Sequence, residues 1–157
     1  NKTRYGHFEG DTVVAPKHAP NTESIAITAE RKINFLVGTK IPSLSPTHMQ
    51  TAVEYIGSEV DMKSLTLDNG NENRSHKSWN VPAFFCDPHA PWQKPHVENG
   101  IGLLRRWFIR KKTDLATIPE PLLQTYLSIL NTKYRKSLKY KSAYELALEH
   151  GIIKKII

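Results

Sequence analysis

The chain has 157 residues, of which 39% are hydrophobic, and this suits a single domain with its own core. Its apolar runs are far shorter than the roughly 18 residues that a membrane helix needs, and its first residues lack the layout of a secretory signal. The one cysteine, Cys86, excludes an internal disulfide and suits a reducing compartment, and the formal net charge of +7 favours nucleic acid as a partner.

The first third of the chain is predicted to form three strands. Residues 8–14 make the first strand, residues 24–32 alternate apolar and polar side chains, and residues 33–41 form a third, apolar run. Short loops between such segments favour antiparallel pairing.

The next segment is predicted to be a helix over residues 45–60. Ser45 can cap it, and Pro46 can occupy its first turn, where a missing N–H costs little. Apolar residues at 49, 53, 56 and 60 recur at helical spacing. Two further strands are expected at 64–68 and 81–87, with a polar loop between them.

The last third is predicted to be helical. A helix begins near Pro95, a second follows the break at residues 119–121 and includes Tyr134 in its apolar stripe, and a third spans residues 142–150. Three antiparallel strands, followed by two strands reached through a helix, predict a five-stranded mixed α/β sheet with helices on both faces.

Three acidic residues occupy positions that suit metal ligands. Asp11 lies within a strand, Asp68 ends a strand before the turn Asn69-Gly70, and Glu98 lies at the start of a helix. Carboxylates from three different elements can hold two magnesium ions, which is the arrangement used to cut and join phosphodiester bonds. Taken singly, each acid also has a purely structural explanation: Asp68 is a common residue type in turns, and Glu98 interacts favourably with the helix dipole in a first turn.

Longer motifs surround these acids: GHFEGDTVV, ERKINFLVGTKIP, TLDNGNEN and FCDPHAPWQKPHVENGIGLLRRWF. In this order they resemble the core of bacterial DDE transposases of the insertion-sequence-30 family. The similarity runs from about residue 6 to residue 147, and the segment from FCDP to LLR is its most specific part.

The resemblance implies an RNase H-like fold and a magnesium-dependent transposase, with manganese as a substitute ion. Asp11, Asp68 and Glu98 would be the catalytic and metal-binding residues. The partners implied are DNA, both the transposon ends and the target, and further copies of the chain. We expect a cytoplasmic, nucleoid-associated protein that binds no membrane, with residues 1–157 forming one catalytic domain of a longer chain whose DNA-binding domain precedes it.

Some positions depart from the family pattern. Only 29 residues separate Asp68 from Glu98, fewer than is common in the family, and the shortfall falls where the family has a helix. Asn73 replaces the usual Phe, and Pro95 replaces the usual Gly. Two alternatives therefore stay open: a related integrase or RNase H-like nuclease, and a DNA-binding protein that keeps the fold without catalysis.

Several other residues are candidates for supporting roles. Gln93 and Lys94 lie just before the helix of Glu98, and Arg105 lies about two turns after Glu98 near the same face; all three are expected to contact the DNA backbone. Glu9 shares a strand face with Asp11; it is either a further ligand or positioner, or the partner of a basic residue, which we favour. Asn69 and Glu72 are candidates for orienting Asp68.

A zinc site is not expected, although Cys86 and His89 have C-x-x-H spacing, because no second pair follows at the usual distance. The apolar setting of Cys86 predicts a buried strand residue, and Trp92 is expected in the core.

Basic residues are concentrated in two stretches, 105–112 and 133–141, where aromatic side chains are interleaved with them. This pattern is typical of a phosphate-contacting surface. It equally fits solvated helix faces whose aromatic side chains, Trp107, Phe108, Tyr134 and Tyr140, point into the core.

Overall fold

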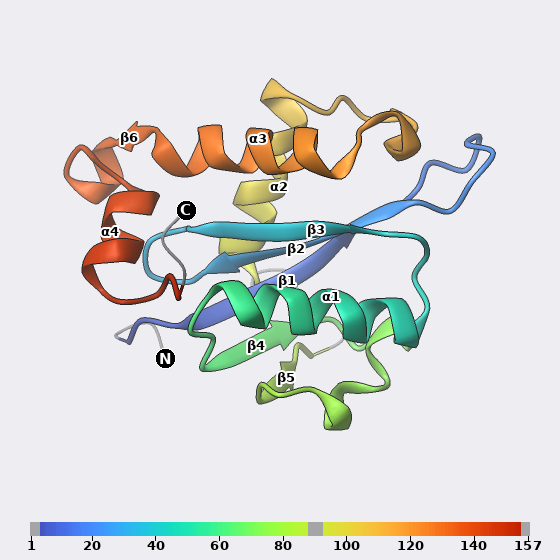
Figure 1. Cartoon of the computed structure of the whole chain (residues 1–157), viewed down its shortest axis with the longest axis horizontal. Coiled ribbons are helices and arrows are strands. Elements are labelled where there is room, and N and C mark those ends of the chain that lie inside the picture. Colours follow the sequence, from blue (N-terminus) through green and yellow to red (C-terminus); the bar gives the residue numbers. More distant parts are fainter. Residues whose placement is uncertain (1–3, 88–92, 155–157) are drawn as a thin grey trace.

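The computed structural model describes residues 4–87 and 93–154. Its centre is a five-stranded sheet in the order β3-β2-β1-β4-β5 (Figure 1). The strands are β1 (His7–Val13), β2 (Ser24–Glu30), β3 (Leu36–Ile41), β4 (Ser64–Leu67) and β5 (Ala83–Phe85). β1, β2 and β3 pair antiparallel, whereas β4 and β5 join β1 in parallel. The predicted mixed sheet is thus confirmed, including which strands are parallel.

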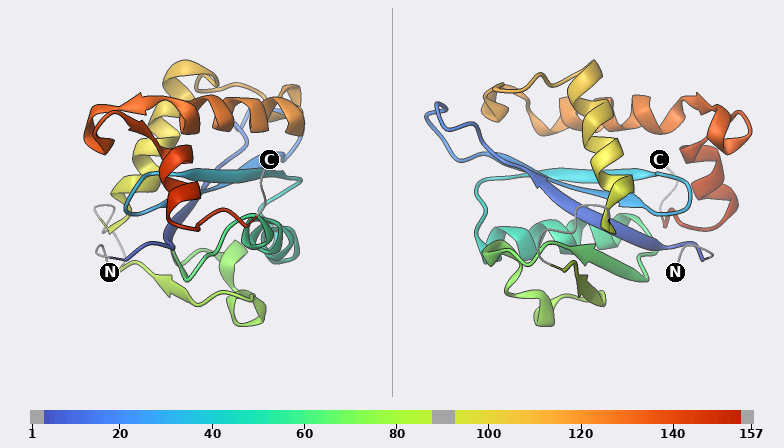
Figure 2. Two further views of the ribbon diagram at one scale, coloured as in Figure 1. Left: turned by 60° about the vertical axis from the view of Figure 1, so that its left-hand side comes forward. Right: turned by 180° about the vertical axis from the view of Figure 1, so that it is seen from behind.

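Helices cover both faces of this sheet, as predicted. α1 (Pro46–Glu59) lies on one face, and α2 (Pro95–Trp107) and α3 (Glu120–Thr132) lie on the other (Figure 2). α4 (Ala143–Glu149) follows near the end of the chain. Ser45 caps α1 by accepting a hydrogen bond from the backbone N–H of His48 at 3.1 Å, the role expected from the sequence.

A separate hydrophobic core fills each side of the sheet. Phe8, Val53 and Leu65 belong to the core that also includes residues of α1 and α4. Ile27 and Leu104 belong to the second core, beneath α2 and α3. Every residue of β2 is buried, because this strand lies inside the sheet with both faces covered.

The packing of α2 is close at Gly100. A Cβ atom at this position would lie 2.5 Å from Leu36 Cδ2, so with a larger residue either the buried Leu36 side chain or the helix would have to shift. Because α2 also carries Glu98, this contact helps to fix how near the glutamate comes to the strands.

Side chains of α3 close the outer edge of the sheet at β3. The Asn131 amide donates to the carbonyl of Leu36, and its oxygen accepts from the Leu36 N–H, both at 2.8 Å. Glu120 accepts from the backbone N–H of Lys40 at 2.9 Å, and Gln124 donates to the carbonyl of Gly38 at 2.8 Å. These bonds take the place of a neighbouring strand.

Two sequence-based expectations need correction. α3 ends at Thr132, and Tyr134, which we expected in its apolar stripe, is 73% exposed in a short strand β6 (Tyr134–Arg135). This strand pairs with β7 (Lys141–Ser142). The segment expected as a buried strand over 81–87 is shorter, and Phe84 within it is 58% exposed, because β5 is the last strand of the sheet.

The loop between β4 and β5 contains two short 3₁₀ turns, η1 (Asn71–Asn73) and η2 (His76–Ser78). The sequence comparison predicted a short or missing helix here, and these turns fit that expectation. Two further 3₁₀ turns, η4 (Leu115–Thr117) and η5 (Lys136–Leu138), lie in the helical third of the chain. Within the described residues, the helices are all too short or too polar to cross a membrane.

Candidate active site

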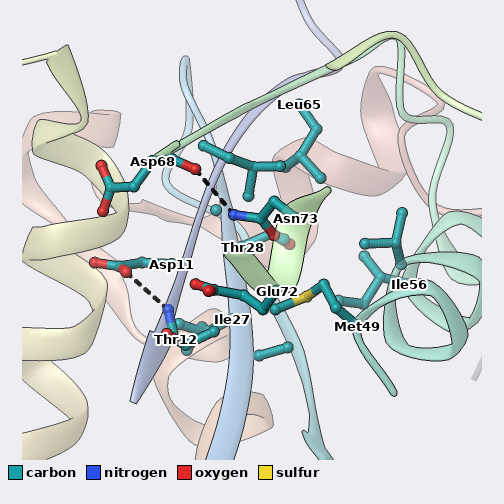
Figure 3. Close-up of a pocket in the computed structure, with 14 residues that line it drawn as sticks. Asp11, Thr12, Ile27, Thr28, Met49, Ile56, Leu65, Asp68, Glu72 and Asn73 are labelled. Atoms are coloured by element: carbon teal, nitrogen blue, oxygen red, sulfur yellow. Dashed lines mark hydrogen bonds between the residues drawn. The ribbon is translucent and has the colours of Figure 1, made fainter. Parts of the chain in front are cut away.

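Two of the three predicted ligands converge where the central strands β1 and β4 lie side by side. Asp11 projects from β1, and Asp68 follows the last residue of β4, its parallel neighbour. Both carboxylates extend toward the side where α2 lies (Figure 3). They line a small pocket of about 20 Å³, which has room for little more than one water molecule.

The basic residue Lys94 links the two aspartates. Its ammonium nitrogen lies 2.9 Å from Asp68 Oδ2 and 3.6 Å from Asp11 Oδ2, and it donates to the carbonyl of Gly10 at 3.2 Å. Only 2% of its side chain is exposed. Lys94 was predicted to contact the DNA backbone, and that role stays a prediction. In this structure its side chain points inward, because a carbonyl and two carboxylates can compensate the cost of burying its charge.

Glu98 lies in the first turn of α2, as predicted, with its side chain exposed. Its backbone N–H donates to the carbonyl of Lys94 at 3.3 Å, which places it one helical turn beyond that lysine, about 6 Å along the helix axis. Among residues 4–87 and 93–154, no three His, Cys, Asp or Glu side chains are grouped closely enough to hold a metal. The structure thus brings Asp11 and Asp68 together and leaves Glu98 one turn of helix away.

Glu9 fixes the start of α2. Its Oε1 atom accepts hydrogen bonds from the backbone N–H groups of His96 at 2.7 Å and Val97 at 3.0 Å. Its Oε2 atom lies 3.2 Å from Arg31 Nε as an ion pair, although the two are not aligned as a hydrogen bond. This confirms the expectation that Glu9 pairs with a basic residue. It also makes Glu9 a helix cap delivered from a strand, since α2 has no side-chain cap of its own.

Asn73 is a residue whose importance the sequence did not reveal. It is buried, and its amide donates to the backbone carbonyl of Asp68 at 2.9 Å, an atom that also accepts from the N–H of Gly70 at 2.9 Å. These bonds fix the turn that presents the Asp68 carboxylate. The only signal in the sequence was that Asn73 stands where the resembled family has Phe.

The other predicted DNA contacts are placed as follows. The Gln93 side chain accepts from the backbone N–H of Asp87 at 2.8 Å and so joins the segment after β5 to the residues before α2. Arg105 is partly exposed and donates to the carbonyl of Arg110 at 3.2 Å, and burial lowers the pKa of its guanidinium. Their roles with DNA stay predictions. Trp92 and His89 lie outside the described residues.

Cys86 is buried, in agreement with the sequence-based expectation, and it lies just beyond the end of β5. Burial raises the pKa of its thiol, and the nearby Lys94 ammonium offsets only part of that effect. A thiol that resists ionisation is a poor nucleophile.

Three of the four aromatic side chains in the basic stretches are exposed, which contradicts the interpretation that they fill the core. Trp107 is 54% exposed and Tyr140 is 68% exposed, in addition to Tyr134. The fourth, Phe108, stacks on Tyr126 with ring centroids 4.5 Å apart. Trp107 therefore remains available to a partner.

The site suits a divalent cation in its chemistry. Two carboxylates and a carbonyl surround a position that a positive charge, the Lys94 ammonium, already occupies. Oxygen ligands of this kind are those that magnesium prefers, and magnesium commonly keeps several waters besides a few protein ligands.

The sequence of the chain is similar to those of transposases. No protein-family model matches the chain. The transposase InsI of insertion sequence element IS30A from Escherichia coli strain K12 is 33% identical over 159 residues, which cover 97% of this chain. This chain spans only 40% of the length of that transposase.

Solved structures show the same fold at lower identity. The catalytic core domain of BIV integrase superposes with a TM-score of 0.65 at 17% identity, over 92% of this chain and 94% of that domain. A chain of the simian T-cell lymphotropic virus intasome, solved in complex with the PP2A regulatory subunit B56 gamma, gives a TM-score of 0.73 at 15% identity, over 96% of this chain and 56% of that chain. The fold is thus the RNase H-like fold of integrase catalytic cores.

Proposed function

This chain is a homologue of the insertion-sequence-30 transposases, and we propose from that kinship that it catalyses metal-dependent DNA cleavage and strand transfer during transposition. The observation that carries the proposal is the convergence of Asp11 and Asp68 on one cation position. Both residues lie within the sequence motifs that suggested the family. The fold supports the proposal, because it is shared with integrase catalytic cores.

Asp11 and Asp68 would hold one divalent ion between them, and Glu98 would complete a second site from α2. Bound magnesium supplies an activated oxygen nucleophile and stabilises the leaving oxygen. In the first step water attacks a phosphodiester, and the P–O bond to a DNA 3′-oxygen breaks. In the second step that 3′-hydroxyl attacks a target phosphodiester, so one P–O bond forms as another breaks and no energy source is needed.

The remaining residues of the site would position these groups. Glu9 holds the first turn of α2, which carries Glu98, and Asn73 holds the turn that carries Asp68. The partners proposed are two DNA segments, the element end and its target, together with a second protomer.

Nicking of supercoiled DNA in magnesium or manganese tests this proposal. Asp11→Asn, Asp68→Asn and Glu98→Gln should each reduce nicking more than about 100-fold, because outer partners of metal ligands alone cost 10- to 100-fold. The control is Asp61→Asn, an exposed carboxylate paired with Lys63 at 3.2 Å, which should leave nicking unchanged. Nicking by the three site variants at the rate of the unmodified chain would refute the assignment.

A second candidate function is DNA binding without catalysis, and the exposed position of Glu98, apart from the two aspartates, favours it. Duplex binding with no metal-dependent nicking would support this alternative. Offering duplex ends and RNA–DNA hybrids beside supercoiled DNA separates a transposase from a related integrase or hybrid nuclease.

A further inference from the structure

Lys94 is a buried cation at the centre of the proposed metal site. Its ammonium is held by Asp68 Oδ2, the Gly10 carbonyl and Asp11 Oδ2, at 2.9, 3.2 and 3.6 Å. A buried ammonium is costly unless oxygens surround it, and here it has three close to it. In return, the single positive charge of the lysine offsets part of the repulsion between the two carboxylates.

The oxygens that hold this ammonium are those that the proposed metal would need. Carboxylate and carbonyl oxygens are the preferred ligands of magnesium and manganese. An ammonium and a divalent ion have charges of the same sign, so they repel strongly at the distances found here. The two cations therefore compete for Asp11 and Asp68.

We propose that Lys94 is an internal counter-ion of the Asp11–Asp68 pair, and that a divalent ion binds there only by displacing its ammonium. This inference rests on the proposed function, since it concerns the same metal site. Lys94 immediately precedes α2. The displaced ammonium is then free to meet a DNA phosphate, so the predicted DNA contact of Lys94 belongs to the metal-bound state.

Removing this charge need not disturb the fold. The first turn of α2 is held by Glu9 through His96 and Val97, not by the side chain of Lys94. Lys94→Met retains a long apolar stem that can fill the same space. The variant is therefore expected to fold, and circular dichroism checks this.

Manganese titration of the metal-free protein, followed by the electron paramagnetic resonance signal of free Mn²⁺, tests the inference without an activity assay. Lys94→Met should bind Mn²⁺ at least about tenfold more tightly than the unmodified chain, because one competing cation is gone. The matched control is Lys40→Met, which removes another largely buried lysine, one paired with Glu23 at 2.7 Å. It should leave Mn²⁺ affinity unchanged.

Asp68→Asn distinguishes failure of the proposed metal site from failure of the counter-ion role of Lys94. If Asp68→Asn removes Mn²⁺ binding but Lys94→Met leaves the affinity unchanged or weaker, the counter-ion inference is overturned and the metal site stands. If Mn²⁺ binding is absent from every variant, or persists fully in Asp68→Asn, both the site and the inference are overturned. Tighter binding in Lys94→Met that is lost again when Asp68→Asn is added supports both.

Discussion

The carboxylate of Glu9, in the middle of β1, accepts a hydrogen bond from the backbone N–H of Val97 in the first turn of α2, at 3.0 Å. The two residues are 88 positions apart in the sequence. A strand thus caps the helix whose own preceding residue, Lys94, provides no side-chain cap. The side chain of that lysine points toward the aspartates instead, so the capping of the first turn of α2 depends on Glu9.

Replacing Glu9 should destabilise the protein measurably. Glu9→Ala removes two hydrogen bonds to a buried charge and leaves Arg31 without its partner, so we expect a loss of about 3 kcal/mol in the free energy of unfolding. Urea denaturation measures it. Glu23→Ala, which removes the partly exposed partner of Lys40, should cost at most about 1 kcal/mol. Similar losses in the two variants would contradict the capping role.

The basic stretches should contribute to duplex DNA binding. They hold ten of the 22 lysines and arginines and no acidic residue, so the other 140 residues are net acidic, with 12 basic and 15 acidic side chains. Lys133 Nζ lies 4.6 Å and the Arg106 guanidinium 5.3 Å from the ring centroid of exposed Trp107, which gathers two cations at one place.

Arg106→Ala and Lys133→Ala should therefore weaken DNA binding similarly for all sequences. Each should reduce the slope of log affinity against log salt by about 0.9, the value for one phosphate contact. Fluorescence anisotropy at several salt concentrations gives the slope. Lys63→Ala, in the segment between α1 and β4, is the control and should leave the slope unchanged. If neither Arg106→Ala nor Lys133→Ala changed the slope, the surface around Trp107 would be excluded as a DNA contact.

The hydrogen bonds from Asn131 of α3 to the backbone of Leu36 in β3 predict a second effect on the free energy of unfolding. Asn131→Leu removes both hydrogen bonds to Leu36 and leaves a buried N–H and C=O unpaired, which should cost about 2 kcal/mol or more. Thr125→Leu, a similar change at an exposed position of the same helix, should alter stability by less than about 0.5 kcal/mol. Thermal unfolding of both variants tests this, and an Asn131→Leu protein as stable as the parent would contradict it.

Cys86 should react slowly with iodoacetamide in the folded protein. Burial raises the pKa of its thiol, so at pH 8 less thiolate is present than in a free cysteine, and the onset of labelling should shift to higher pH. In urea the rate should rise to that of a free thiol. Because this is the only cysteine, mass spectrometry reads the result directly. Fast labelling under native conditions would show that the thiol is accessible.

Much of the fold could be predicted because its signals are local. Ser45 and Pro46 indicate where α1 begins, and Pro95 indicates where α2 begins. Asp11 and Asp68 could be selected from their local settings and from the motifs around them, and the structure adds that they lie on neighbouring parallel strands. The mixed character of the sheet followed from the helix between the third and fourth strands, whereas the order of the strands did not.

The remainder depends on contacts between distant residues. Nothing near Lys94 in the sequence shows that its ammonium meets the carbonyl of Gly10, 84 positions away. Tyr134 continued the helical spacing of α3, although the helix ends two residues earlier, because periodicity alone does not mark a helix end. Asn73 supports the turn at Asp68 through a hydrogen bond to the Asp68 carbonyl, and this contact is visible only in the folded chain.

The side chains of Glu120, Gln124 and Asn131 leave β3 with few free backbone groups, and this limits how copies of the chain can associate. Two protomers cannot pair their β3 strands edge to edge to form one continuous sheet. The backbone donors and acceptors that such pairing needs are already engaged within each molecule. A symmetric pair that used this side would have to meet through helix surfaces. Its geometry would then be set by the shape and charge of side chains, and a single substitution at Asn131 could divert it toward strand-mediated aggregation.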